Sequence, residues 1–184
     1  SAAMRLTEQA ADRENSGHGM ANATDRAPWY YEMQELGFNY RITDIQCALG
    51  LSQLSKLDAF LARRREIAAR YTAAFSKSEL LIAPHQETDR ESAWHLYMLR
   101  LRLDRVSKSR RQIFEALRAR KIGVHVHYIP LHLQPYYQEK FAYKRGDFPE
   151  SEAYYDAALT IPLFPAMSDS ECERVTDAVL ACVC

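Results

Sequence analysis

The pattern of apolar and polar residues between positions 42 and 76 predicts one long amphipathic helix. Over the first half of this stretch the apolar residues recur every three, four or five positions, as on one face of a helix: Ile42, Ile45, Leu49, Leu54, Leu57 and Leu61. Thr43 and Gln46 match a capping box, and Asp44 adds negative charge at the positive end of the helix dipole. We expect a helix over residues 43–76, about 50 Å long, whose stripe faces a core; a break within 62–65 is the alternative.

Three later segments predict β-strands, namely residues 80–83, 92–103 and 124–129. In the second, alternate side chains from Ala93 to Leu103 share one face. The first and third end at Pro84 and Pro130, which cannot donate to a strand ladder.

The remaining segments predict helices. Ser109 and Gln112 open one helix before the third strand, and Ser168 and Glu171 form a capping box for the last. Between them we expect a helix-like or turn segment at 133–141, a helix at 150–160 preceded by Pro149, and extended chain at 161–165. Strand, helix and strand with short connections favour an α/β fold.

Composition excludes several classes of function. Lys and Arg together number 24, as do Asp and Glu, so the formal net charge is zero and no overall field attracts nucleic acid or an anionic membrane. No apolar run approaches the roughly 20 residues that cross a bilayer, and the N-terminus lacks the pattern of a signal peptide. We expect a soluble, cytoplasmic protein that binds neither nucleic acid nor membrane.

Cysteine and histidine spacing does not indicate a metal site. The four cysteines contain no C-x-x-C pair, which favours small apolar residues in a reducing compartment: Cys47, Cys172, Cys182 and Cys184. His125 and His127 face the same way on the predicted strand and His132 follows the turn, but no carboxylate or cysteine lies in that run. These histidines either bind a ligand or pack in an aromatic core.

Asn39 and Arg41 are candidate anion-binding residues because they precede the start of the long helix. The alternatives are that Asn39 is a turn residue and that Arg41 pairs with Asp44 or Glu35. No G-x-S-x-G motif or P-loop occurs, and three lysines have contexts unsuited to covalent catalysis: Lys108, Lys121 and Lys140.

Two sequence blocks resemble a known enzyme family. The block from Trp29 to Leu54, which includes Gly37-Phe-Asn-Tyr-Arg-Ile-Thr-Asp-Ile-Gln, is similar to the segment G-x-N-x-R-x-T/D-x-x-Q-A-A-x-x-x-x-Q-L of the DegT/DnrJ/EryC1/StrS family of pyridoxal-phosphate (PLP) dependent sugar aminotransferases. Val126-His-Tyr-Ile-Pro-Leu-His-Leu-Gln-Pro-Tyr-Tyr137 is similar to the family's H-Y-x-P-L-H-x-x-P-Y segment. The resemblance runs from Trp29 to the C-terminus, with a weaker match at residues 17–20, and is strongest to transaminases of pseudaminic acid synthesis.

This resemblance implies the C-terminal small α/β domain of a fold-type I PLP aminotransferase, a small sheet packed with helices. Residues 1–42 would be a partly disordered remnant of the large domain. Residues 43–76 would be the linking helix, and residues 77–184 the small domain.

The resemblance also implies the function of the parent enzyme, which would move an amino group from glutamate to C4 of a UDP-linked keto-deoxy-sugar. In the homodimer, Asn39 would reach the PLP phosphate of the neighbouring subunit, with the charge of Arg41 beside it. His127, Tyr128 and His132 would line the sugar-nucleotide pocket.

We expect this chain to lack the family's Schiff-base lysine and the aspartate that pairs with the pyridine nitrogen. It would then contain no catalytic residue, bind no PLP covalently and be inactive alone. A parent with histidine in place of that lysine would dehydrate its substrate instead. The alternative function is a stand-alone, non-catalytic α/β module that binds a partner or a nucleotide.

Overall fold

The computed structural model describes residue 38 and residues 40–184, and the chain divides into two units, Ser1–Leu54 and Ser55–Cys184. The described part of the first unit contains helix α1, Asp44–Leu54. Its predicted capping box is confirmed, because the Thr43 N–H donates to Gln46 Oε1 over 2.9 Å and the Gln46 N–H donates to Thr43 Oγ1 over 3.4 Å. The start of the helix is therefore fixed locally by the sequence.

The single helix expected over 43–76 is wrong, because the chain forms two helices, α1 and α2 (Leu57–Phe75). Ser55 and Lys56 form the turn between them. The helix continues unbroken through residues 62–65, where Arg64 donates to the carbonyl oxygens of Trp94 and Leu163 over 3.1 and 3.2 Å. These contacts with other segments of the second unit stabilise residues 62–65, where a break in the helix was the alternative prediction.

The apolar stripe of α1 is exposed, so the prediction that it faces a core is wrong for this chain. No residue of α1 is buried, and Ile45 and Leu49 are 76% and 60% exposed. On α2 the stripe begins exposed, with Leu57 45% exposed, and its later part, Tyr71 and Phe75, is fully buried. Helical periodicity shows that a face needs a cover, but the covering surface comes from elsewhere in a fold.

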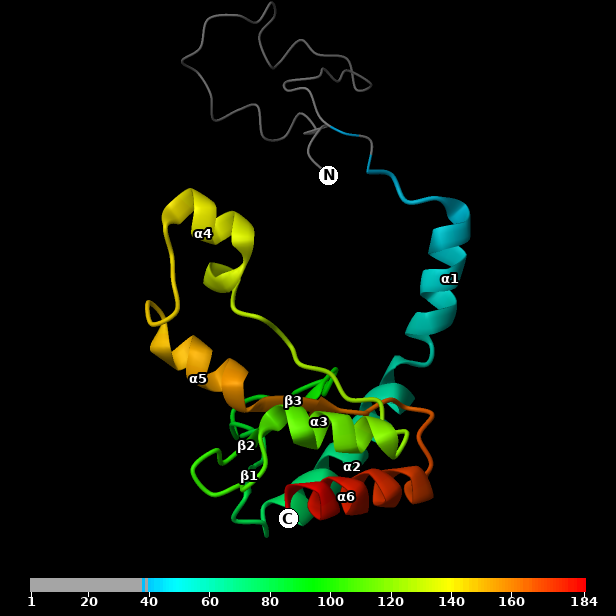
Figure 1. Cartoon of the computed structure of the whole chain (residues 1–184). Helices are drawn as coiled ribbons and strands as arrows, with labels where there is room; N and C mark the ends of the chain where they lie inside the picture. Colours follow the sequence, from blue (N-terminus) through cyan, green and yellow to red (C-terminus); the bar gives the residue numbers. More distant parts are fainter. Residues whose placement is uncertain (1–37, 39) are drawn as a thin grey trace, which may run out of the picture. The chain divides into compact units, whose positions relative to one another are not determined.

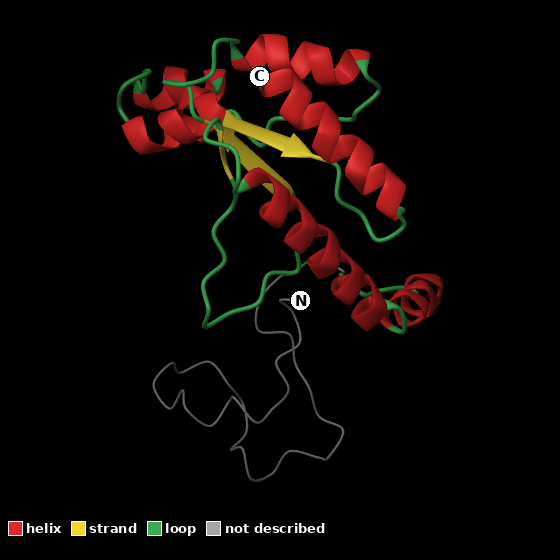
Figure 2. Cartoon of the chain, turned by 90° about the horizontal axis from the view of Figure 1, so that it is seen from below, coloured by secondary structure: helices red, strands yellow, loops and turns green. Residues whose placement is uncertain are grey.

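Three short strands form an antiparallel sheet in the order β1-β2-β3: β1 Leu81–Ile82, β2 Tyr97–Leu101 and β3 Ala158–Ile161. Leu81 pairs with Leu101, and Tyr97 pairs with Ile161. Strand β2 is shorter than the segment 92–103 that predicted it, and its alternation is confirmed by the burial of Tyr97, Leu99 and Leu101. Figure 2 shows the sheet in yellow beside the helices that cover it.

Strand β3 lies largely within residues 150–160, where a helix was predicted, and the strand predicted at 124–129 is not formed. Residues 124–129 contribute only one bridge, in which His125 and Thr160 exchange N–H···O bonds of 3.1 and 2.8 Å. Helix α5 (Pro149–Ala157) ends early, and all four residues of β3 are buried. The edge of β2 has backbone groups that need hydrogen-bond partners. The segment Ala158–Ile161 pairs with that edge and buries its own side chains in the core. This tertiary pairing therefore outweighs the local tendency of the helix to continue.

The other predicted helices are present. Helix α3 (Arg110–Ala119) and helix α6 (Asp169–Val183) both begin with the expected capping boxes. The 133–141 segment is a 3-10 turn, η3 (Leu131–Leu133), followed by helix α4 (Pro135–Phe141).

The core of the second unit lies between the sheet and the helices. Helix α6 packs against both α2 and α3, α5 contacts β2, and α4 stands away from this layer (Figure 1). Fully buried large side chains come from α2, β2, α3, β3 and α6: Tyr71, Phe75, Tyr97, Leu99, Ile113, Leu117, Leu159 and Val179. Cys172 and Cys182 join this core, whereas Cys47 and Cys184 are exposed. Among the described residues, no helix is long and apolar enough to cross a membrane.

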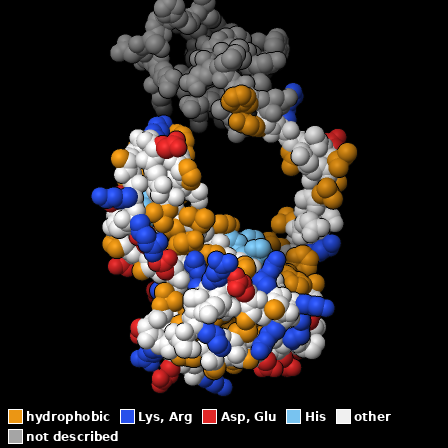
Figure 3. Space-filling model, in the orientation of Figure 1, with side chains coloured by type: hydrophobic (Ala, Val, Ile, Leu, Met, Phe, Trp, Pro, Cys, Tyr) orange, Lys and Arg blue, Asp and Glu red, His pale blue; other side chains and the backbone are white. Residues whose placement is uncertain are grey.

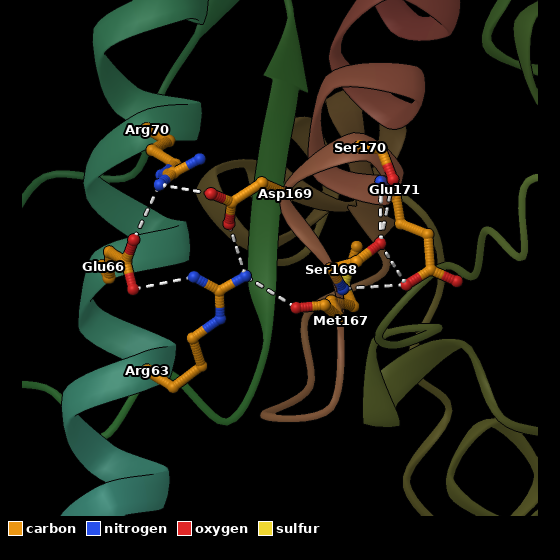
Figure 4. Close-up of polar contacts among 8 residues, drawn as sticks. All are labelled: Arg63, Glu66, Arg70, Met167, Ser168, Asp169, Ser170 and Glu171. Carbon is orange, nitrogen blue, oxygen red and sulfur yellow. Dashed lines mark hydrogen bonds and ion pairs between the residues drawn. The ribbon is translucent and has the colours of Figure 1, made fainter.

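A network of charged side chains ties α2 to the start of α6 (Figure 4). Arg63 contacts Glu66 Oε2 and Asp169 Oδ1, each over 2.7 Å, and donates to the Met167 carbonyl over 2.6 Å. Arg70 contacts the other oxygens of the same two carboxylates over 2.8 and 2.9 Å. Hydrogen bonds from Arg63 and then Arg70 lower the pKa of Asp169 below its ordinary value.

This network predicts a loss of stability in acid. Because the folded pKa of Asp169 lies below its unfolded value of about 3.8, its contribution is present above that value and disappears as the pH falls through the folded pKa. We expect Asp169→Asn to lower the Tm by a few degrees at pH 7 and by less at pH 3, as measured by thermal unfolding. Asp177→Asn, at an exposed position of the same helix, is the control. An equal Tm difference at both pH values would contradict the assignment.

Candidate functional site

The candidate residues fall in two groups that belong to different units of the chain. Asn39 lies outside the described residues, and Arg41 precedes α1 in the first unit. His127, Tyr128 and His132 belong to the second unit.

Arg41 and the start of α1 have groups that suit a phosphate. The side chain of Arg41 is exposed, and a guanidinium matches the geometry of phosphate oxygens. The N-terminal end of α1 adds the partial positive charge of the helix dipole, although Asp44 in the first turn offsets some of it. The donor set is thus compatible with the phosphate group of PLP.

Two of the three lysines judged unsuited to covalent catalysis have hydrogen-bond partners in the structure. Lys108 donates to the carbonyl oxygen of Cys182 over 3.0 Å, and Lys140 donates to the Tyr136 hydroxyl over 2.9 Å. Neither contact is with His127 or Tyr128.

The ring of His127 is held by a buried hydroxyl. His127 Nδ1 lies 2.8 Å from Thr160 Oγ1, and Thr160 is only 5% exposed on β3. The ring of Tyr128 lies 4.6 Å from that of His127, at an interplanar angle of 83°, and 74% of Tyr128 is exposed. The structure therefore brings a fixed imidazole and an open aromatic ring together, and Figure 3 shows histidine side chains grouped on this surface of the second unit.

The surroundings of His127 favour its neutral form. Partial burial, together with the neighbouring His125 and His95, lowers the pKa of His127 below its ordinary value. A neutral imidazole can hydrogen-bond a ligand through Nε2 but supplies no full charge to a diphosphate. Within residues 38 and 40–184, no cluster of three or more histidine, cysteine or acidic side chains is arranged to hold a metal ion.

His132 lies in a different environment from the other two pocket candidates. It is buried, its Nε2 lies 2.8 Å from Glu152 Oε1, and its ring packs 4.7 Å from that of Phe148. In the described part of the chain, no hydrogen bond or ring contact joins His132 to His127 or Tyr128. Its assignment to the sugar-nucleotide pocket stays a prediction.

Sequence reasoning missed Thr160 and Glu152, the two residues that hold these histidines. Thr160 falls at the end of the expected helix 150–160, where nothing in the sequence indicates a pairing with His125. Glu152 lies in the first turn of the helix that begins at Pro149, where acidic residues commonly interact with the helix dipole. Its position in the sequence therefore indicates no buried partner. Both partners are distant in sequence, and only tertiary structure identifies them.

Comparison with known proteins identifies the family. The sequence profile described as the DegT/DnrJ/EryC1/StrS aminotransferase family matches residues 6–180. The chain belongs to this family. Its members are PLP-dependent sugar aminotransferases. The predicted fold class, a small α/β domain with a small sheet packed with helices, is confirmed, and the structure shows that the sheet is antiparallel.

Three relatives illustrate the match. The spore coat polysaccharide biosynthesis protein SpsC of Bacillus subtilis is 42% identical over 180 residues, which cover 94% of this chain and 46% of SpsC. The solved structure of Helicobacter pylori PseC, an aminotransferase involved in the biosynthesis of pseudoaminic acid, superposes with a TM-score of 0.75 at 26% identity and covers 86% of this chain and 42% of PseC. Spr1654 of Streptococcus pneumoniae, solved in apo, PLP and PMP forms, gives a TM-score of 0.74 at 28% identity. In its apo form the match covers 84% of this chain and 38% of Spr1654.

The chain spans less than half the length of these relatives. The family and the fold are thus shown for this chain. They do not by themselves show the activity, substrates or partners of a whole protein of that length.

Proposed function

We propose that this chain is the C-terminal portion of a PLP-dependent aminotransferase that moves an amino group from glutamate to C4 of a UDP-linked keto-deoxy-sugar. The family match over residues 6–180 carries the proposal. The similarity to PseC supports a sugar of the pseudaminic acid type, and the similarity to SpsC supports a role in polysaccharide biosynthesis. The enzyme would be a cytoplasmic homodimer.

The domain organisation follows from this proposal. Residues 1–42 belong to the large domain, α1 and α2 link the two domains, and residues 77–184 form the small domain. The exposed apolar stripe of α1 supports this division, because a helix with Ile45 and Leu49 exposed needs a cover that the described residues do not supply.

In the proposed enzyme, Asn39 and Arg41 bind the PLP phosphate of the partner subunit. PLP, when bound, supplies the electron sink that amino-group transfer requires. The Asn39 amide donates one hydrogen bond, and the Arg41 guanidinium adds charge that retains the phosphate. Arg41 lies just before the capped start of α1.

His127 and Tyr128 contact the sugar nucleotide in this proposal. The exposed ring of Tyr128 offers a face on which a uracil can stack. The hydrogen bond between Thr160 Oγ1 and His127 Nδ1 fixes the ring, so its Nε2 can hold a polar group of the ligand in one direction. Because that ring is neutral, the charge of a diphosphate must be met by arginine or lysine elsewhere in the enzyme.

The second function, a non-catalytic binding module, is less well supported. The relatives matched here include solved aminotransferases such as PseC. A module that only binds a nucleotide would explain the exposed Tyr128, but it would not explain family similarity over nearly the whole chain.

The proposal is tested with the whole enzyme, glutamate labelled with ¹⁵N, and a UDP-linked 4-keto-6-deoxy-sugar. We expect mass spectrometry to show one ¹⁵N atom in the product sugar, and NMR to place it on C4. Absence of transfer to every UDP-keto-sugar offered, with PLP present, would exclude this substrate class.

A separate prediction concerns this chain alone. We expect no single lysine to become labelled at one equivalent when the chain is treated with PLP and borohydride, because we place the residue that bonds the cofactor outside this chain. Peptide mapping by mass spectrometry measures this. Stoichiometric labelling of one lysine, prevented by phosphate-containing competitors, would show the prediction to be wrong.

A further inference from the structure

A buried carboxylate, that of Glu152, joins three segments of the chain near the start of α5. Its side chain and that of His132 are each 7% exposed. Glu152 Oε1 lies 2.8 Å from His132 Nε2 and 2.8 Å from the backbone nitrogen of Gly146. Oε2 accepts from the same Gly146 N–H over 3.0 Å, and the Phe148 N–H donates to Oε1 over 3.4 Å. The contacts connect η3, the loop before α5 and α5 itself.

These donors explain how an ionised carboxylate is kept inside the fold. Burial of an unpaired carboxylate is costly, and the cost is offset only when its lone pairs receive hydrogen bonds. Burial by itself would raise the pKa of Glu152, but the hydrogen bonds from His132, Gly146 and Phe148 lower it below its ordinary value. Glu152 is therefore an acceptor at neutral pH.

The direction of the contact with His132 follows. An ionised carboxylate has no proton to donate, so the nitrogen that faces it must carry one. That nitrogen is His132 Nε2. When the ring is neutral, its lone pair therefore lies on Nδ1, which is then a hydrogen-bond acceptor. Such an acceptor repels the oxygens of a phosphate but can bind an O–H or N–H group.

We propose that Glu152 is a positioning residue that fixes His132 with a proton on Nε2 and holds the loop at Gly146–Phe148 against η3. In its neutral form the ring then has one remaining acceptor, Nδ1. The ligand part rests on the function proposed above, and it assigns His132 to a hydroxyl or amide N–H of the sugar and not to the diphosphate.

Ring-nitrogen NMR of the ¹⁵N-labelled chain tests the first part without any mutation. We expect long-range ¹H–¹⁵N correlations at neutral pH to show the proton of His132 on Nε2. A proton on Nδ1, or a ring that exchanges between the two forms, would overturn the proposal.

Hydrogen exchange in Glu152→Gln tests the hold on the loop. A glutamine cannot accept from His132, Gly146 and Phe148 with both terminal atoms, so we expect amide exchange at Gly146 and Phe148 to accelerate about tenfold to a hundredfold. Glu150→Gln, at an exposed position of the same helix, should leave these rates unchanged. Equal rates in the two variants would overturn the assignment.

Two substitutions of His132 separate its two nitrogens. His132→Gln can place an amide N–H near the Nε2 position and should keep the slow exchange at Gly146. His132→Asn offers an oxygen near the Nδ1 position but no donor to Glu152, so exchange should be fast. The opposite order would contradict the geometry.

Steady-state kinetics of the whole enzyme test the ligand part. We expect His132→Gln to raise KM for the UDP-sugar about tenfold with kcat unchanged, because it retains the fold but removes the acceptor. An unchanged KM, with the NMR and exchange results as expected, would overturn the ligand part alone. An enzyme that transfers no amino group to any UDP-keto-sugar would refute the proposed function and, with it, the ligand part, while the role of Glu152 would stand on the NMR data.

Discussion

Tyr97→Ala is expected to lower the free energy of unfolding by about 3–5 kcal/mol, the usual cost of removing a large aromatic side chain from a core. Tyr97 is 0% exposed on the central strand β2. Its ring lies 5.2 Å from that of Tyr71, in an edge arrangement, and 5.6 Å from that of Trp94. Little of the cavity can close, because the surrounding rings come from α2 and from the segment before β2.

Tyr97→Phe is the matched control for this prediction. It keeps the ring but removes the hydroxyl, which lies 2.8 Å from Thr72 Oγ1. We expect a cost of about 0.5–1.5 kcal/mol for that bond. Urea denaturation, with similar m-values for all three proteins, measures both changes. If the phenylalanine variant were as unstable as the alanine variant, the hydroxyl and not the ring would dominate.

Asn39→Ala is expected to weaken PLP binding in the whole enzyme by about tenfold to a hundredfold. The physical reason is the loss of one hydrogen bond to a charged phosphate, worth about 1.5–3 kcal/mol. Equilibrium dialysis of PLP measures the change. His132→Ala is the comparison, because it removes no phosphate contact; cofactor affinity should stay unchanged while KM for the sugar nucleotide rises.

A mixed dimer tests whether Asn39 serves the neighbouring subunit. One subunit carries Asn39→Ala and the other lacks the Schiff-base lysine. The site that retains its lysine then receives an intact Asn39 from across the interface, so about half of the wild-type activity per dimer should return. Activity no higher than that of the single variants would mean that Asn39 acts in its own subunit.

Capping boxes and burial alternation were predictable from the sequence because both are local. The Thr43, Ser109 and Ser168 caps bond groups three residues away, so no distant partner is needed. The alternation of Tyr97, Leu99 and Leu101 predicted a strand because side-chain direction in a strand depends only on the parity of position.

The candidate site was predictable only in part. The blocks containing Arg41 and His127 led to the correct family, which the match over residues 6–180 confirms. The roles of Asn39, Arg41, His127, Tyr128 and His132 remain predictions. The buried pairing of His132 with Glu152 was not foreseen, because no spacing rule relates residues twenty positions apart on different elements.

The sequence by itself determined where most helices begin, which face of β2 is buried and to which family the chain belongs. Tertiary structure alone decided that 158–161 is a strand, that 124–129 is not, and that the α1 stripe is exposed whereas the later part of the α2 stripe is covered. The physical reason is the same in each case. A local sequence pattern indicates which groups need burial or a hydrogen-bond partner. The surface that buries those groups, or the partner that bonds them, comes from residues far away in the chain.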